Sequence, residues 1–274
     1  MPFVTRPIPP YLAPVVEELE LVAAKLVTMA DLRRIVQGRG VKTAPGRIAA
    51  ELRSRGWLLA TGTRGVWEFA PAAHAGPYGH GQPFRAVKAA LLAGPETEIQ
   101  VCLNSALWAR GLLDSAPDRP EVAVAPGTRV PESLRRTCRV VKFEAQLPTD
   151  MLFDVPVHSL ATILVHLATK PTDVRSWGLV LETLPELVGD ILASERESLD
   201  VELKSRPAAV RTRLAYLTEG VAKTLARDLA PRDRGVVWFG RRDAPTKRFH
   251  SALNVVDTIL PVAPSQILPV GHTS

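Results

Sequence analysis

The chain has 274 residues, a formal net charge of +6 and a sequence pI of about 9.6. With 46% hydrophobic and 23% charged residues, it has the composition of a globular protein, which excludes wholesale disorder. No apolar run approaches the roughly 18 residues that a membrane-spanning helix needs, and the N-terminus lacks the pattern of a secretory signal. Cys102 and Cys138 are too few for a disulfide framework and lack zinc-ligand spacing, so we expect buried thiols, a cytoplasmic protein and no membrane partner.

The positive charge is concentrated in two parts of the chain. Residues 1–85 contain 11 basic and 6 acidic side chains, residues 86–202 contain 11 and 17, and residues 203–250 contain 12 and 4. Such asymmetry favours a polyanionic partner such as nucleic acid. A solvated surface with chance clustering of charges is the alternative.

Hydrophobic periodicity predicts three helices before residue 56. The first covers residues 14–26 and the second covers residues 29–36. Thr28, with Asp31 three positions later, has the pattern of an N-terminal cap for the second helix. The third helix is predicted over residues 43–55, with a proline in its first turn.

The third predicted helix has a small and basic outward face. At 100° per residue, Ile48 and Leu52 face the core. The opposite face consists of Gly46, Arg47, Ala50, Arg53 and Ser54. The two small residues allow a partner to approach closely, and the two arginines offer forked donors that suit guanine edges or phosphates.

Two short β-rich runs, residues 57–61 and 66–69, surround a glycine-containing turn and predict a hairpin with Arg64 at its tip. Three helices followed by such a hairpin are typical of a winged helix-turn-helix, whose third helix enters the major groove of DNA. A protein-docking module of the same shape is the alternative. The predicted DNA-binding residues are Arg33, Arg34, Lys42, Thr43, Arg47, Arg53, Ser54 and Arg64.

The sequence predicts an α+β fold in which a winged helix-turn-helix precedes a larger C-terminal domain of helices around a small mixed sheet. A run rich in proline and glycine predicts a linker over 71–83 between a DNA-binding domain, 1–70, and the C-terminal domain, 84–274. The helices predicted beyond the linker cover 84–94, 103–113, 159–168 and most of 201–228, with an interruption at Pro207. The predicted strands are 120–125, 138–143, 155–157 and 236–239.

Four motifs in this order resemble the AbiEi family, the antitoxins of type IV (abortive-infection) toxin–antitoxin systems. They are Arg64-Gly-Val-Trp67, Asn104-Ser-Ala-Leu-Trp108 with Gly111-Leu112, Val122-Ala-Val-Ala125 before Pro126-Gly127, and Asp154-Val-Pro-Val-His-Ser159. The resemblance covers roughly residues 15 to 190, and the long linker departs from the family pattern.

The resemblance implies a cytoplasmic prokaryotic DNA-binding protein. Such a protein represses its own operon by binding inverted repeats, and it counteracts a cognate nucleotidyltransferase-like toxin, with or without direct contact. Because palindromic operators usually bind paired protein copies, we expect two molecules per operator.

A second cluster of basic residues lies outside the resemblance. It comprises Arg211, Arg213, Arg241, Arg242, Lys247 and Arg248. These residues are either a solvated surface or a second contact surface for phosphates or for an acidic partner.

No catalytic motif stands out. The chain has no phosphate loop, no nucleophile elbow and no H-E-x-x-H sequence. His158 and His166 are eight positions apart, and the apolar neighbours of His166 predict a core histidine. We therefore expect a non-enzyme without metal or cofactor. Two alternatives stay open: a one-component regulator that binds a small ligand in residues 84–200, and an enzyme such as a nuclease that the N-terminal region tethers to DNA.

Overall fold

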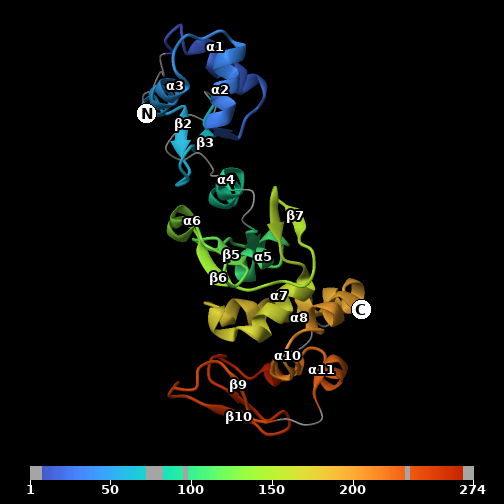
Figure 1. Cartoon of the computed structure of the whole chain (residues 1–274). Coiled ribbons are helices and arrows are strands. Elements are labelled where there is room, and N and C mark those ends of the chain that lie inside the picture. Colours follow the sequence, from blue (N-terminus) through green and yellow to red (C-terminus); the bar gives the residue numbers. More distant parts are fainter. Residues whose placement is uncertain (1–7, 72–82, 95–97, 232–234, 268–274) are drawn as a thin grey trace. The chain divides into compact units, whose positions relative to one another are not determined.

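The computed structural model describes residues 8–71, 83–94, 98–231 and 235–267 (Figure 1). These residues form eleven α-helices and eleven strands in three small sheets, so the predicted α+β class is confirmed. They belong to two compact units, which are described one by one. The first comprises Met1–Glu98 with Thr128–Arg139, and the second comprises Ile99–Gly127 with Val140–Ser274.

The first unit contains five helices and one sheet. Its elements are α1 (Ala13–Leu21), β1 (Leu26–Thr28), α2 (Met29–Gly38), α3 (Pro45–Ser54), β2 (Leu58–Ala60), β3 (Val66–Phe69), α4 (Arg85–Ala93) and α6 (Glu132–Thr137). The sheet is antiparallel with the order β1-β3-β2, and the predicted hairpin is its β2–β3 pair. Helices α1, α2 and α3 close over this sheet, and the core includes Leu32, Ile48, Leu52 and the stacked rings of Trp57 and Phe69.

The helix predicted over 14–26 is wrong at its C-terminal end. Helix α1 ends at Leu21, Ala23 adopts a positive φ of 49°, and Leu26 starts strand β1. The pairing of β1 with β3 buries Val27 and leaves Val22 exposed. A short apolar run is compatible with both the helical and the strand period. Here the pairing with β3, about forty residues later, makes the run a strand.

The predicted cap of the second helix is confirmed. The Asp31 N–H donates to Thr28 Oγ1 at 3.1 Å, and the Thr28 N–H donates to Asp31 Oδ2 at 3.0 Å. This reciprocal pair satisfies two backbone donors that the first turn of a helix leaves without partners. It therefore sets the point at which β1 ends and α2 begins.

The second unit contains two mixed sheets packed with helices. Its first part comprises β4 (Gln100–Val101), α5 (Leu103–Ala109), β5 (Glu121–Val124), β6 (Arg139–Lys142), β7 (Asp150–Leu152), β8 (Val155–Val157) and α7 (Leu160–Thr169). The five strands have the order β6-β5-β4-β8-β7, with β4 and β8 parallel. Its second part comprises α8 (Trp177–Ser194), α9 (Arg196–Leu203), α10 (Ala208–Thr218), α11 (Lys223–Leu229), β9 (Val237–Phe239), β10 (Arg248–His250) and β11 (Val255–Asp257).

Helix α7 is the centre of the second unit. Every residue from Ala161 to Ala168 is buried, and the helix packs against α5, α8, α9 and α10. Ser159 is its cap, as predicted, because its Oγ accepts a hydrogen bond from the Thr162 N–H at 3.2 Å. The apolar run of the predicted helix thus fills the core on all sides rather than on one face.

The structure differs from the predicted C-terminal domain in three ways. The sequence pattern did not predict α8, and the segment after Phe239 adds β10 and β11, so that two small sheets replace one. Helices α4 and α6 belong to the first compact unit, whereas the predicted limits place them in 84–274. Most of the predicted linker, residues 72–82, lies outside the described residues, so the domain limits stay a prediction.

Candidate nucleic-acid interface

Helix α3 turns the predicted face to solvent. Ile48, Ala49 and Leu52 are buried, and the exposed residues of the helix are Gly46, Arg47, Ala50, Arg53 and Ser54. The facing predicted from periodicity is therefore confirmed. The small side chains between the two arginines leave the helix surface low, so that a flat or grooved partner can reach its backbone.

The first unit presents exposed cations that have no intramolecular partner. Among the described residues, no hydrogen bond or ion pair engages the side chains of Arg33, Lys42, Arg47, Arg53 and Arg64, and all five are exposed. Arg34 differs, because it donates to Asp31 Oδ1 at 2.9 Å. Unpaired cations at a surface attract polyanions more strongly than paired ones, because no carboxylate has to be displaced.

The start of α3 is open as well. Ala44 occupies the cap position and provides no side-chain acceptor, and Pro45 has no N–H. A Cβ built on Gly46 would have no atom within 4 Å, so space lies in front of this turn. Thr43 is half-buried beside it. A helix N-terminus in this state suits a phosphate, because its amides point outward and its dipole favours negative charge.

The tip of the β2–β3 hairpin is held in a defined shape. The Thr61 hydroxyl donates to the Val66 carbonyl at 2.8 Å, and the Thr63 N–H donates to Thr61 Oγ1 at 3.3 Å. The Gly65 carbonyl accepts from the Met29 N–H at 2.9 Å, which ties the hairpin to the first turn of α2. Arg64 is therefore carried by an ordered turn.

Helix α6 lies against this hairpin. The sequence pattern predicted neither the helix nor this contact. A Cβ built on Gly62 would lie 2.9 Å from Thr137 Cγ2, so the two segments touch. Arg135 and Arg136 are exposed on α6, and Arg136 pairs with Glu132 at 3.2 Å. The run of two arginines was visible in the sequence, but only the fold brings it next to a turn about 70 residues earlier.

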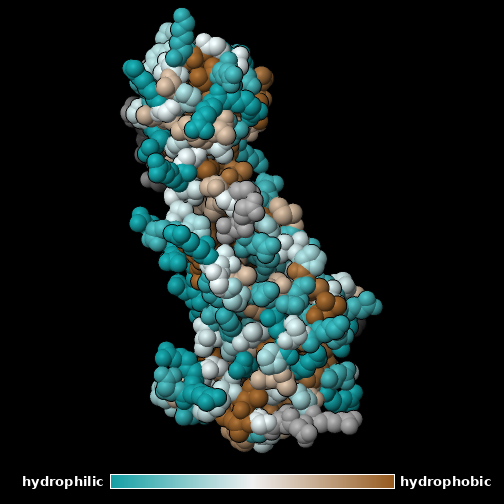
Figure 2. All heavy atoms as spheres, viewed as in Figure 1, coloured by the Kyte–Doolittle hydropathy of each residue, from teal (hydrophilic) through white to brown (hydrophobic). Residues whose placement is uncertain are grey.

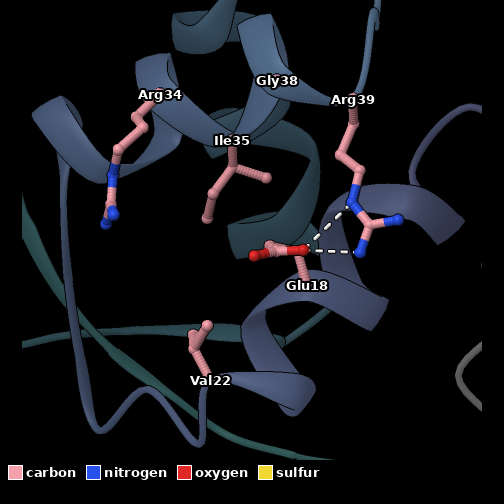
Figure 3. Close-up of a pocket in the computed structure, with 6 residues that line it drawn as sticks. All are labelled: Glu18, Val22, Arg34, Ile35, Gly38 and Arg39. Atoms are coloured by element: carbon pink, nitrogen blue, oxygen red, sulfur yellow. Dashed lines mark hydrogen bonds and ion pairs between the residues drawn. The ribbon is translucent and has the colours of Figure 1, made fainter.

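A hollow of about 280 Å³ lies between α1 and α2 (Figure 3). Arg39 bridges the two helices by donating from Nε to Glu18 Oε2 at 3.0 Å, and Val22 and Ile35 supply apolar lining. The ion pair thus joins α1 to α2, the helix that packs against α3. The hollow lies outside residues 84–200, in which the small-ligand hypothesis predicted a pocket.

The second predicted basic cluster does not form one surface. Arg213 donates from Nε to the Trp238 carbonyl at 2.7 Å and from Nη1 to the Thr169 carbonyl at 3.2 Å, and burial lowers the pKa of its guanidinium. Arg211 donates to the Leu203 carbonyl at 3.2 Å. Arg213 is thus a structural group that joins α10 to the end of α7 and to β9, and we correct its assignment to an exposed surface.

The remaining members of the cluster lie on or near the β9-β10-β11 sheet. Arg248 donates to the buried Asp257 at 2.9 Å, and Arg241 pairs with Asp243 at 3.1 Å. Lys247 Nζ lies 5.3 Å from the centre of the Trp238 ring. Arg242 is exposed and engages no other side chain among the described residues. Arg242 and Lys247 are therefore the cations of this group that remain available to a ligand.

The interior of the second unit contains a buried polar cluster. His158 and His166 are both fully buried, and the His166 ring stacks on Phe143 with 3.9 Å between ring centres. His158 Nε2 lies 3.0 Å from Gln100 Oε1. Burial lowers the pKa of both histidines, that of His158 well below its ordinary value, because charging a ring costs solvation energy there. The lowered pKa values favour neutral rings at pH 7, and His166 is the core histidine that its neighbours predicted.

Two kinds of feature are absent from the described part of the chain. No helix within it is both long and apolar enough to cross a bilayer. No three His, Cys, Asp or Glu side chains in the same part come together at a spacing that could hold a metal ion. What these residues do offer is a set of exposed cations on α2, on α3, in the turn before α3 and at the tip of the β2–β3 hairpin.

The chain is similar to known proteins in sequence and in fold. Residues 99–220 match the family model described as the AbiEi antitoxin C-terminal domain. The fold is similar to the crystal structure of the RV2827C protein from Mycobacterium tuberculosis, with a TM-score of 0.78 and 23% sequence identity, over 93% of this chain and 94% of that chain. No curated protein matches the chain. The structural likeness shows a shared fold, and the family match confirms the resemblance for the three motifs that lie within residues 99–220.

Proposed function

Because this chain contains an AbiEi antitoxin C-terminal domain over residues 99–220, we propose that it is a DNA-binding antitoxin that represses its own toxin–antitoxin operon. A toxin–antitoxin role follows from the family. The DNA-binding part of the proposal rests on one observation: α2, the turn before α3, α3 itself and the tip of the β2–β3 hairpin carry five exposed cations that have no partner among the described residues.

In the proposed complex, the first unit acts as a winged helix-turn-helix. Helix α3 enters the major groove, where its low surface at Gly46 and Ala50 permits close approach. Arg47 and Arg53 lie near base edges, and Thr43 and Ser54 lie at the margins of the same face. The hairpin follows the sugar–phosphate backbone, with Arg64 at a phosphate.

The other cations hold the protein in register on the duplex. Arg33, Arg34 and Lys42 contact phosphates on either side of the groove. Arg135 and Arg136 extend this surface beyond the hairpin, because α6 touches Gly62. Each neutralised phosphate releases counterions, which supplies affinity without sequence information.

Repression then needs two copies of the chain. One α3 reads a short half-site, and an inverted repeat presents two such half-sites related by a two-fold axis. We propose that two copies bind each operator in the cytoplasm and that the second unit, without catalysis of its own, counteracts a nucleotidyltransferase-like toxin.

Fluorescence anisotropy with the promoter fragment of the chain's own operon tests the DNA-binding part. The full-length chain is compared with Arg47→Ala/Arg53→Ala/Arg64→Ala, and Arg227→Ala, at an exposed arginine of α11, serves as the control for loss of an arginine elsewhere on the surface. We expect the triple variant to lose binding and the control to retain it. The slope of log K against log salt should fall by about one unit for each phosphate contact removed. A chain that ignores the promoter at low salt would contradict the proposal.

Co-expression with the toxin tests the antitoxin part separately. The full-length chain should restore growth of cells that express the toxin. We expect the triple variant to restore growth too, because the substitutions lie outside residues 99–220. Failure of both proteins to restore growth would contradict the antitoxin role while leaving the DNA-binding result intact.

A further inference from the structure

The β9-β10-β11 sheet presents a row of three apolar side chains on one face. Phe249 of β10 pairs with Val256 of β11, and Val256 pairs with Trp238 of β9. Because directly opposite residues of neighbouring strands point to the same side of a sheet, the three side chains share one face. The row therefore runs across all three strands, from one edge of the sheet to the other.

The opposite face of this sheet is closed by α10. The side chains on this inner face of the sheet include Phe239 and Asp257, which are both buried. The Tyr216 hydroxyl donates to Asp257 Oδ2 at 3.0 Å, and the Tyr216 ring lies 5.8 Å from that of Phe239. The face that carries the row of Trp238, Val256 and Phe249, called the aromatic row below, is therefore the outer face of the sheet. Phe249 is 61% exposed.

The rings of Trp238 and Phe249 are far enough apart for each to stack with a separate ring of a ligand. Neighbouring strands are about 4.8 Å apart, so β9 and β10, with β11 between them, are roughly 10 Å apart. That distance lets one planar ligand ring stack on Trp238 and another on Phe249 with Val256 below the gap. Aromatic residues on a sheet that stack two or three unpaired bases are a general means of recognising single strands.

The segment that joins β9 to β10 is rich in cations. Residues 235–250 contain four Lys or Arg and one acidic residue, Asp243. Arg241 forms an ion pair with Asp243, whereas Arg242 has no partner among the described residues. Lys247 lies over the Trp238 ring, so a base stacks there only when this side chain swings aside, where it can meet the phosphate of the same nucleotide. Figure 2 shows hydrophobic and strongly hydrophilic surface side by side over β9 and β10.

We propose that this sheet face binds single-stranded nucleic acid, with bases stacked on Trp238 and Phe249 and phosphates beside Arg242 and Lys247. The flanking cations favour a polyanion over an apolar protein surface. A duplex does not fit, because its bases already stack on one another and offer no free face. The surface shares no residue with the one proposed for operator DNA, so the two proposals stand or fall separately.

The test uses the full-length chain that carries Arg47→Ala/Arg53→Ala/Arg64→Ala, so that the first unit contributes little. Fluorescence anisotropy follows its binding to a labelled 12-nucleotide single strand, once as RNA and once as DNA, with a hairpin duplex as competitor. We expect binding that the duplex displaces poorly. Phe249→Ala should weaken it about 5- to 150-fold, the usual loss for one stacked base.

The matched control is Phe153→Ala. Phe153 is also an exposed aromatic residue of the second unit, at 46%, but its neighbours Asp150 and Asp154 are acidic. It should leave the affinity unchanged. Trp238→Leu keeps an apolar side chain in the row and should still weaken binding, because an aliphatic group cannot stack like an aromatic ring.

The charges are tested by the salt dependence. Arg242→Gln and Lys247→Gln should each lower the slope of log K against log salt by about 0.7, the value for one phosphate contact of a single strand. Binding of either strand supports the proposal, and a preference between RNA and DNA identifies the natural ligand. Absence of single-strand binding at low salt, or equal losses in Phe249→Ala and Phe153→Ala, would overturn it.

Discussion

Glu202, near the end of α9, places its carboxylate against the Thr162 hydroxyl of α7, with 3.2 Å between the two oxygen atoms. The same carboxylate accepts the N–H of Gln146 at 2.9 Å and that of Leu147 at 3.2 Å, and it pairs with Arg206. Glu202 is fully buried. One charged group thus holds two helices and the segment after β6 together, and its charge is matched inside the protein.

Removal of this carboxylate should be strongly destabilising. Glu202→Ala leaves two backbone N–H groups without their acceptor and the Arg206 guanidinium without its counter-charge, and we expect a loss of about 3–5 kcal/mol in the free energy of unfolding. Urea denaturation monitored by circular dichroism measures it. Glu197→Ala, at an exposed position of the same helix, should change stability by no more than about 0.5 kcal/mol. Equal effects of the two substitutions would contradict the role given to Glu202.

The buried histidines make stability depend on pH. Burial lowers the pKa of His158 and His166 in the folded chain from an ordinary value of 6.5, so below that pH the unfolded chain binds more protons. Stability is therefore unaffected by these groups above pH 6.5 and falls as the pH drops below it. The slope should approach about 1.4 kcal/mol per pH unit for each histidine.

Urea denaturation at pH 7.5, 6.0 and 5.0 checks this dependence. His158→Gln and His166→Gln should each flatten it, even where they lower stability at pH 7.5. Asp173, whose Oδ2 lies 3.9 Å from His166 Nε2, partly offsets the effect at His166. We therefore expect the larger flattening in His158→Gln, and a slope that neither substitution alters would rule out this origin.

Arg213 should matter for folding rather than for ligand binding. Its guanidinium donates to carbonyls at the end of α7 and in β9, so Arg213→Met should destabilise the chain by about 1–3 kcal/mol through buried acceptors left without donors. Thermal denaturation measures the loss. Single-strand affinity, measured at a temperature where both proteins are folded, should stay within about twofold of the parent chain. Arg242→Met should show the reverse pattern.

Arg47 should contribute sequence preference as well as affinity. If it reads a guanine, Arg47→Ala should reduce discrimination at one base pair by about 1–3 kcal/mol. Lys42→Ala, which removes a phosphate contact in the same proposal, should weaken binding to operator and random DNA equally. Anisotropy with a set of single-base-pair operator variants distinguishes them. An equal loss on operator and random DNA for Arg47→Ala would remove it from the bases.

The first unit could be predicted well wherever local chemistry decides the structure. The cap at Thr28 and the facing of α3 depend on residues three or four positions apart, and both are confirmed. Strand β1 could not be predicted, because its partner β3 lies about forty residues later. Helix α8 escaped prediction because Gly178, Pro185 and Gly189 interrupt an otherwise helical pattern.

The candidate surfaces also show that local patterns could be predicted and long-range contacts could not. The exposure of Arg47 and Arg53 followed from helical periodicity alone. The bonding of Arg213 to backbone carbonyls did not, because α10 is enclosed on nearly all sides: Thr212 and Tyr216 are buried along with the apolar stripe of Val210, Leu214 and Leu217. The aromatic row at Trp238 and Phe249 depends on strand register, which no single strand carries in its own sequence.

The path of the chain between its two compact units has a practical consequence. Because Thr128–Arg139 returns to the first unit after Ile99–Gly127 has entered the second, the backbone passes between them three times. No single cleavage can release either unit intact. A break after Glu98 separates α6 from the rest of the first unit, and a break after Arg139 separates β4, α5 and β5 from the rest of the second unit. Grafting the first unit onto another protein would therefore require two junctions. A protease that cuts one of the three connections would leave the two units joined by the other two.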